Sequence, residues 1–237
     1  MRGCAMISAR IAAMVLLASA TPAFAQAYQC RVPQRIEPPA APRQDGPERR
    51  TALGGYVLAA SWSPEYCNTN RRAGGSMQCS GSAGRFGFIL HGLWPEAPQG
   101  APPQWCSSGI RPSVEELRRN LCMTPSPELL EHEWAKHGSC MAKTPESYFA
   151  TARGMWNRIA WPDADRLSRK PALTAGDLRQ AFIAANPGWT PGSIAIRLSQ
   201  SGWLREVHLC LDSRRKPARC SRPGARDGQA MKIWRGL

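Results

Sequence analysis

Several features that would assign this chain to a familiar class are missing. The sequence has only four histidines and contains neither a C-x-x-C pair nor an H-E-x-x-H segment, spacings by which many proteins bind zinc. We therefore expect no metal and no other cofactor. No internal repeat is present, which excludes solenoid and propeller architectures. Beyond residue 25, no stretch is apolar enough to span a bilayer.

The first 25 residues have the pattern of a secretory signal peptide. Arg2 and Arg10 are its charged residues, residues 11–20 are apolar, and Ala23-Phe24-Ala25 resembles a cleavage site. The alternative, a membrane anchor, needs a longer apolar run. We expect a mature chain from Gln26 that is periplasmic or extracellular and does not associate with a membrane. An Ala-rich signal and the lack of N-x-S/T sites favour a bacterial source.

Eight cysteines remain after Cys4 is removed with the signal peptide. An even number in an exported chain predicts disulfide bonds, and free buried thiols are the alternative. Eight cysteines allow 105 pairings, so counting alone does not choose between them. The eight are Cys30, Cys67, Cys79, Cys106, Cys122, Cys140, Cys210 and Cys220.

The chain is strongly basic, with a formal charge of +14 that falls to +12 when Arg2 and Arg10 are removed. A basic surface attracts nucleic acid, anionic lipid or acidic polysaccharide, and charge alone does not select one of them. The arginine-rich residues 214–235 are interpreted as a solvated surface that attracts RNA without reading its sequence.

Composition and pattern predict an N-terminal arm and one domain. Residues 26–50 are rich in Pro, Arg and Gln, which predicts a poorly ordered arm tied down at Cys30, while residues 51–237 form a single domain. Alternating apolar residues predict strands at 56–62 and 85–91, the second ending at His91, and a hairpin over 194–211. Residues 63–84 and 95–112 are predicted loops.

Four helices are predicted from their start and stop signals. They cover residues 113–121, 126–137, 145–159 and 174–186, and Ser113 with Glu116 has the spacing of a capping box. Strands and helices are interleaved without regular βαβ units. We predict an α+β fold in which an antiparallel sheet that carries His91 packs against several helices.

Four reactive side chains lie within six residues of the second predicted helix. His132, Glu133, Lys136 and His137 fall at about 0°, 100°, 40° and 140° around a helix, on one contiguous arc. The alternative zinc site needs histidines four apart, whereas His132 and His137 are five apart. A second alternative is a solvated helix face with incidental histidines. The separate His91 argues against it, because titratable groups rarely gather without a function.

This set of groups suits RNA cleavage by transesterification. The 2′-hydroxyl attacks its own phosphorus, so an enzyme must accept that proton, give one to the 5′-oxygen and stabilise charge on the phosphoryl oxygens. Two imidazoles perform the proton transfers near neutral pH, each worth about 10²–10⁴-fold in rate. A lysine and another polar group stabilise the charge.

Two segments together resemble the active-site segments of the ribonuclease T2 family. They are Phe88-Ile89-Leu90-His91-Gly92-Leu93-Trp94-Pro95 and His132-Glu133-Trp134-Ala135-Lys136-His137-Gly138-Ser139-Cys140. The resemblance implies an α+β fold and metal-free endonuclease activity on single-stranded RNA. It also implies 2′,3′-cyclic phosphate products that are opened to 3′-phosphates.

Roles follow from the resemblance, position by position. His137 matches the general base and His91 the general acid, and the reverse assignment stays open. Glu133 and Lys136 match the groups that stabilise the pentacoordinate phosphorus, and His132 matches a phosphate-binding histidine. Trp94 matches an aromatic residue that stacks on a base, with a core tryptophan as the alternative.

The chain departs from the family pattern at three places, all of which affect base preference. Glu96 follows the first segment where the family often has Asp. Leu129-Leu130-Glu131 stands where the family has a Phe-Trp pair. The aromatic partner for the base is not evident, and Trp105 is our candidate.

The resemblance also predicts how some of the cysteines pair. Cys140 is expected to bond Cys106 of the long loop, and Cys210 to bond Cys220. Cys67, Cys79, Cys122 and Cys30 remain, with Cys67–Cys79 the first choice. The fourth histidine, His208, is interpreted as structural, because it has no reactive neighbour in the sequence.

We therefore predict a monomeric, exported endoribonuclease of low base specificity. The competing hypothesis is a cationic RNA- or surface-binding protein on the same fold that does not cleave. The presence of all five polar residues of the family pattern favours the enzyme.

Overall fold

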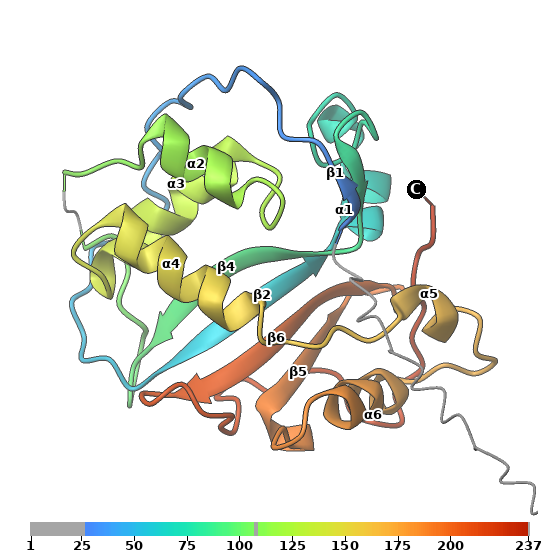
Figure 1. Cartoon of the computed structure of the whole chain (residues 1–237). Helices are drawn as coiled ribbons and strands as arrows, with labels where there is room; N and C mark the ends of the chain where they lie inside the picture. Colours follow the sequence, from blue (N-terminus) through green and yellow to red (C-terminus); the bar gives the residue numbers. More distant parts are fainter. Residues whose placement is uncertain (1–26, 107–108, 237) are drawn as a thin grey trace, which may run out of the picture.

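A four-stranded antiparallel sheet forms the centre of the molecule (Figure 1). The computed structural model describes residues 27–106 and 109–236, so the predicted signal peptide at residues 1–25 lies outside the described residues. The strand order is β4 (Phe88–Glu96), β2 (Gly55–Trp62), β6 (Leu204–Asp212) and β5 (Ile194–Leu198). A second, two-stranded sheet pairs β1 (Ala27–Cys30) with β3 (Gly84–Phe86).

Helices surround the larger sheet. Helices α2, α3 and α4 lie together beside β4, and α6 lies beside β5 (Figure 1). None of the helices in the described part of the chain is long and apolar enough to cross a membrane. Their bounds are α1 (Ser63–Thr69), α2 (Val114–Asn120), α3 (Pro127–Lys136), α4 (Pro145–Trp156), α5 (Ala164–Leu167) and α6 (Ala175–Ala185). Short 3₁₀ turns cover Arg71–Ala73, Gly138–Cys140 and Pro191–Ser193. The predicted α+β class is confirmed.

The two faces of the sheet have different roles. On one face, Leu58 and Ala60 of β2 join the main core, where α3, α4 and α6 contribute large apolar side chains such as Trp134, Phe149 and Phe182. Because side chains alternate along a strand, Val57, Ala59 and Ser61 lie on the opposite face. We call this second face the active-site face.

The predicted loop over residues 63–84 is wrong in part. Helix α1 begins directly after β2, with Pro64 in its first turn, and a 3₁₀ turn follows. Proline is favoured at the start of a helix, because its missing N–H has no partner there in any case. The Gly- and Ser-rich composition of residues 74–84 hid this short helical segment.

The strand that carries His91 differs at both ends from the predicted 85–91. Gly84–Phe86 form β3 of the smaller sheet, and β4 begins only at Phe88. It continues to Glu96 instead of ending at His91, and Pro95 pairs with Tyr56 within it. Strand β4 is an edge of the four-stranded sheet. A proline is tolerated there because its missing N–H leaves no neighbouring strand without a partner.

The N-terminal arm differs from the predicted poorly ordered segment. Residues 31–50 carry no regular secondary structure, yet their backbone meets the domain at several points. Arg118 donates to the carbonyls of Pro33 and Gln34, and Arg49 exchanges two backbone hydrogen bonds with Gln104. Composition predicted disorder because the arm has few large apolar residues, but Val32 and Ile36 pack against the main core and arginines of the domain bind carbonyl groups of the arm.

Glu116 is not part of a capping box. Ser113 caps α2 as predicted by accepting from the Glu116 backbone N–H, at 3.1 Å. The Glu116 side chain is buried and accepts instead from Arg153 at 2.6 Å and from Asn120 at 3.1 Å. A buried carboxylate needs such partners, which bind α2 to α4.

Candidate active site

A β-bulge brings His91 and Trp94 to the same face of the sheet. Ala59 pairs with Gly92 and Ala60 with Leu90, so the register shifts and leaves His91 as the extra residue. In a regular strand, residues three apart point to opposite faces, and a bulge removes that difference. The two rings therefore lie 5.2 Å apart in an edge-to-face arrangement.

Helix α3 and the residue that caps its C-terminal end supply the other four predicted residues. Ser126 caps the helix by accepting from the Leu129 backbone N–H, and Pro127 occupies its first turn. Leu130 and Trp134 anchor one side of α3 in the core, which turns Glu133 towards β4. His132 and Lys136 are partly exposed, and His137 is the residue at which the helix ends. The structure thus brings all five predicted residues together.

Glu133 lies between the two segments. Its Oε2 accepts from Trp94 Nε1 at 2.7 Å, and its Oε1 lies 3.6 Å from His91 Nε2. Gly92 is required for this approach, since a Cβ atom there would collide with the Glu133 carboxylate. Burial raises the pKa of Glu133 to about 7, against the opposing influence of His91 and of the Trp94 bond. Glu133 therefore binds a proton more readily than an exposed glutamate does.

The two candidate catalytic histidines have opposite proton affinities. Burial lowers the pKa of His137 to about 3, and the nearby charges of Lys136 and His132 add to this effect. Burial opposes the charged form of His91 too, but a hydrogen bond to Glu206 and the charge of Glu133 outweigh it and raise its pKa. Two groups whose pKa values are shifted in opposite directions are suited to act as a base and an acid.

Lys136 contacts a residue of the N-terminal arm. Its Nζ donates to Asp45 Oδ2 at 2.7 Å, and Trp105 Nε1 donates to Asp45 Oδ1 at 2.9 Å. The bond from Lys136 lowers the pKa of Asp45, so this carboxyl is an anion. Asp45 was not predicted, because nothing in the pattern of the arm indicates where it meets the domain.

Trp105 does not have the predicted role of base-stacking partner. Its side chain is only 6% exposed, so its ring offers little surface to a nucleobase. The centres of the Trp105 and His132 rings lie 5.4 Å apart in an edge-to-face arrangement, and Lys136 Nζ lies 5.9 Å from the centre of the Trp105 ring. Trp105 therefore packs beneath these two α3 residues. Its surroundings depend on Asp45 and on the path of the loop, which the sequence did not reveal.

The fourth histidine is part of the site's surroundings. His208 lies on β6, with its ring 5.1 Å from Trp94 and its Nε2 2.8 Å from Glu206 Oε2. The sequence missed Glu206 as a neighbour of His91. The signal was present, because Glu206 and His208 alternate along one strand and so share a face.

Four disulfide bonds join the described cysteines. Cys106–Cys140 and Cys210–Cys220 pair as the resemblance implies, and the other two pairs are Cys67–Cys79 and Cys30–Cys122. Cys106–Cys140 connects the residue after Trp105 to the turn that follows His137. It therefore holds the long loop against the end of α3.

Two hollows adjoin the His91–Trp94 pair. One, of about 330 Å³, lies beside His91 and is lined by Tyr66, Leu129 and Glu206 among others. The other, of about 70 Å³, lies beside Trp94 and is lined by Glu96 and His208. Each of the two rings thus has a hollow beside it.

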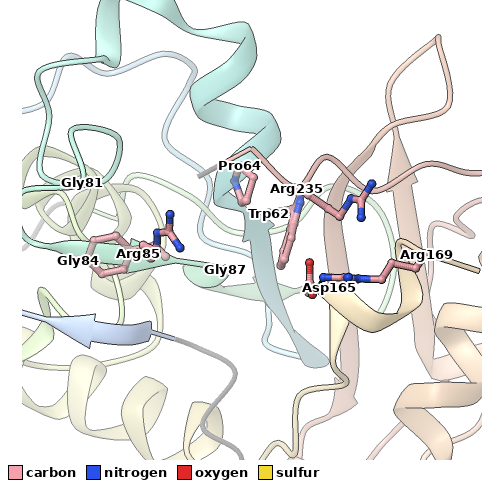
Figure 2. A pocket seen from close by; sticks show the side chains of 10 residues that line it. Trp62, Pro64, Gly81, Gly84, Arg85, Gly87, Asp165, Arg169 and Arg235 are labelled. Carbon is pink, nitrogen blue, oxygen red and sulfur yellow. Dashed lines mark hydrogen bonds and ion pairs between the residues drawn. The ribbon is translucent and has the colours of Figure 1, made fainter.

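A separate hollow of about 800 Å³ lies at the Trp62 end of the sheet (Figure 2). Arg85 reaches into it from β3, and Arg235 and Arg169 line its other side, where Arg169 pairs with Asp165 at 2.6 Å. Its lining contains no histidine, and therefore we place no proton-transfer chemistry there.

Comparison with known proteins decides the family. The model of the ribonuclease T2 family matches residues 53–220. The chain belongs to the ribonuclease T2 family. The five predicted catalytic residues and Glu206 all lie within the match, whereas Asp45 precedes it.

Relatives in the ribonuclease T2 family include bacterial proteins. The chain is 34% identical over 164 residues to a ribonuclease of Aeromonas hydrophila, which covers 66% of this chain and 71% of the relative. It is 32% identical over 137 residues to a probable ribonuclease of Haemophilus influenzae, which covers 52% of this chain and 49%, about half, of the relative. Among solved structures, the S-like ribonuclease trichomaglin has a similar fold, with a TM-score of 0.59 at 20% identity over 76% of this chain and 98% of that one.

Proposed function

We propose that this ribonuclease T2 family protein is a metal-independent endoribonuclease that cleaves single-stranded RNA with low base specificity. The observation that carries the proposal is the pair of histidines with opposed proton affinities, His91 and His137, whose ring centres lie 5.2 Å and 5.6 Å from that of Trp94. RNA cleavage by its own 2′-hydroxyl needs one group that accepts a proton and one that donates a proton.

In the first step, neutral His137 accepts the proton of the 2′-hydroxyl, and the 2′-oxygen forms a bond to phosphorus. His91 donates its proton to the 5′-oxygen as the bond from phosphorus to that oxygen breaks, which leaves a 2′,3′-cyclic phosphate. In the second step, water attacks the cyclic phosphate while the two histidines exchange roles, giving a 3′-phosphate. The negative phosphate raises the low proton affinity of His137 when substrate binds.

The remaining polar residues stabilise the phosphoryl oxygens. Lys136 supplies a positive charge, and His132 is a hydrogen-bond donor beside it. Glu133, protonated in part because its pKa is raised to about 7, donates a hydrogen bond to an oxygen without repelling it. Hydrogen-bond donors that point at the charge developing in the transition state typically contribute a large part of the rate enhancement.

Trp94 has two parts with different roles in this proposal. Its Nε1–H holds Glu133, and its partly exposed ring lines the small hollow where a base stacks. Stacking is tolerant of base identity and is worth about 1–3 kcal/mol per base, which agrees with low specificity.

We also propose that the chain is exported by the signal peptide at residues 1–25 and acts as a monomer outside the cytoplasm. Four disulfide bonds among the described residues support this placement, because such bonds persist in oxidising compartments. Residues 51–237 act as the single ribonuclease domain in this account.

Product analysis tests the proposal. The mature protein is incubated in EDTA with a single-stranded oligoribonucleotide, and the products are weighed by mass spectrometry. We expect 2′,3′-cyclic phosphates first and 3′-phosphates, one water heavier, later. His91→Ala and His137→Ala each lose nearly all cleavage while their thermal midpoints stay close to wild type. RNA binding without cleavage by the wild-type protein would instead support the non-catalytic hypothesis.

A further inference from the structure

Glu206 bridges the two histidines of the sheet. Its Oε1 lies 2.7 Å from His91 Nδ1, and its Oε2 lies 2.8 Å from His208 Nε2. The Ser61 hydroxyl donates to the same Oε1 at 2.9 Å and lies 3.2 Å from His91 Nδ1. Both carboxylate oxygens are thus engaged, and one of them is directed at the candidate general acid.

Small residues on the central strand allow this contact. His91 is on β4 and Glu206 on β6, with β2 between them, so their side chains meet only by reaching across β2. Ser61 pairs with Glu206 and Ala59 with His208, and these two β2 residues are small. A large side chain at either position would separate the imidazole from the carboxylate.

The bond pattern fixes the proton on His208. Arg197 Nε donates to His208 Nδ1 at 3.4 Å, so that nitrogen is an acceptor and His208 Nε2 carries the hydrogen that Glu206 accepts. Arg197 is itself anchored, since it donates to the carbonyls of Arg222 and Pro223, at 3.0 Å each. Each group therefore donates a hydrogen bond to the next, Arg197 to His208 and His208 to Glu206.

We propose that Arg197, His208 and Glu206 form a positioning relay that holds His91 as the proton donor of the cleavage step. Glu206 accepts from Nδ1–H and so leaves Nε2 as the atom that gives and takes the catalytic proton. Nε2 is the nitrogen that faces α3, 3.6 Å from Glu133 Oε1. The inference rests on the proposed role of His91, but not on the identity of the base.

Charges from several elements act on His91, and the proposal depends on their balance. From β6, Glu206 favours the imidazolium, as does Glu133 of α3, while Lys136 opposes it. His132 and His137 face the same space from α3 and from its end, and each is influenced by the charge on His91. Glu65, Tyr66 and Arg205 line the adjoining hollow.

The sign of the expected effect follows directly. His91 must be protonated to donate a proton, and Glu133 must be protonated to donate its hydrogen bond, so the pKa values of both groups set the alkaline limb of the pH profile of kcat/KM. The charge of Glu206 raises both pKa values. Glu206→Gln keeps an acceptor oxygen but removes the charge, which lowers the pKa of His91. We expect the alkaline limb to move to lower pH by about one unit, with kcat/KM about tenfold lower above it. The acid limb, set by the base, stays in place.

The experiment compares pH profiles of kcat/KM on single-stranded RNA for the wild type, Glu206→Gln and Glu115→Gln. Glu115 is an exposed residue of α2 that pairs only with arginines of its own helix among the described residues, so its variant removes the same charge at a distance. Its profile should match wild type. His208→Leu removes the donor that holds Glu206 in place but leaves its charge, so kcat/KM should fall without a shift of the limb to lower pH, whereas His208→Gln keeps an amide donor and should restore kcat/KM.

An unshifted alkaline limb in Glu206→Gln, even with a lower thermal midpoint, would show that Glu206 is only a structural link and overturn the inference. Failure of the proposed function is a separate result, because His91→Ala would then keep its activity. If Glu206→Gln does not fold, nitrogen NMR of the wild type decides. We expect His91 to keep Nδ1–H and to titrate above free histidine, and titration at or below it would refute the relay.

Discussion

The disulfide Cys106–Cys140 should support both stability and catalysis, whereas Cys30–Cys122 should support stability alone. The first bond holds Trp105 beneath His132, and the Trp105 backbone N–H donates to the Lys136 carbonyl at 2.7 Å. The second bond ties the N-terminal arm to the segment after α2. A serine pair at each bond, C106S/C140S and C30S/C122S, gives two variants with the same chemical change.

Loop-closure entropy sets the expected losses of stability. Cys106 and Cys140 are 34 residues apart, and Cys30 and Cys122 are 92 apart. Loops of these lengths correspond to about 4 and about 5 kcal/mol of unfolding free energy, so the bond remote from the histidines is the larger contributor. Chemical denaturation with a fluorescence readout measures both values.

Catalysis should follow the opposite order. Releasing the loop moves Trp105 and the end of α3, and a displacement of about 1 Å at a reacting group can cost about 100-fold in rate. We expect kcat of C106S/C140S to fall about ten- to hundredfold under conditions where it is folded, while C30S/C122S stays within about threefold of wild type. Equal losses of activity in the two folded variants would refute the coupling through Trp105, as would full activity in C106S/C140S.

Two further predictions concern Trp94 and Asp45. Trp94→Phe keeps an aromatic ring but removes the N–H donor to Glu133, so kcat should fall while KM changes little, whereas Trp94→Ala should also raise KM by about fivefold or more. Steady-state kinetics on single-stranded RNA distinguish the two, and a thermal midpoint loss with unchanged KM in Trp94→Ala would make this residue a core tryptophan. Asp45→Asn should lower KM by up to about fivefold, because Lys136 must release this half-exposed carboxylate before it binds a phosphate. An unchanged or higher KM would contradict this competition.

The sequence could place the candidate catalytic groups of α3 close together because they are carried by a local pattern. His132, Glu133 and Lys136 lie on one short helix that is capped by Ser126 and ends at Lys136, and His137 follows directly as its C-terminal cap. The spacing around a helix depends only on local geometry, so the arc of reactive groups follows once the helix is assigned.

Features that depend on contacts between distant segments were not predicted. The bulge at His91 is a register shift against Ala59 and Ala60, and strand alternation alone does not reveal it. The same holds for Asp45, because the sequence pattern does not show where the N-terminal arm meets the domain. Glu206 could be predicted in part. The alternation along its strand shows that it shares a face with His208, but its contact with His91 follows only from the order of the strands in the sheet.

The central claim is that a 2′-hydroxyl of the RNA is the nucleophile and that His91 and His137 transfer its protons without a metal. The most direct test incubates the mature protein in EDTA with an oligoribonucleotide and with its 2′-fluoro twin of the same sequence. We predict cleavage of the unmodified strand only. Cleavage of both strands would contradict the claim, because the 2′-fluoro strand lacks the nucleophile, and cleavage of neither would assign the protein to RNA binding instead.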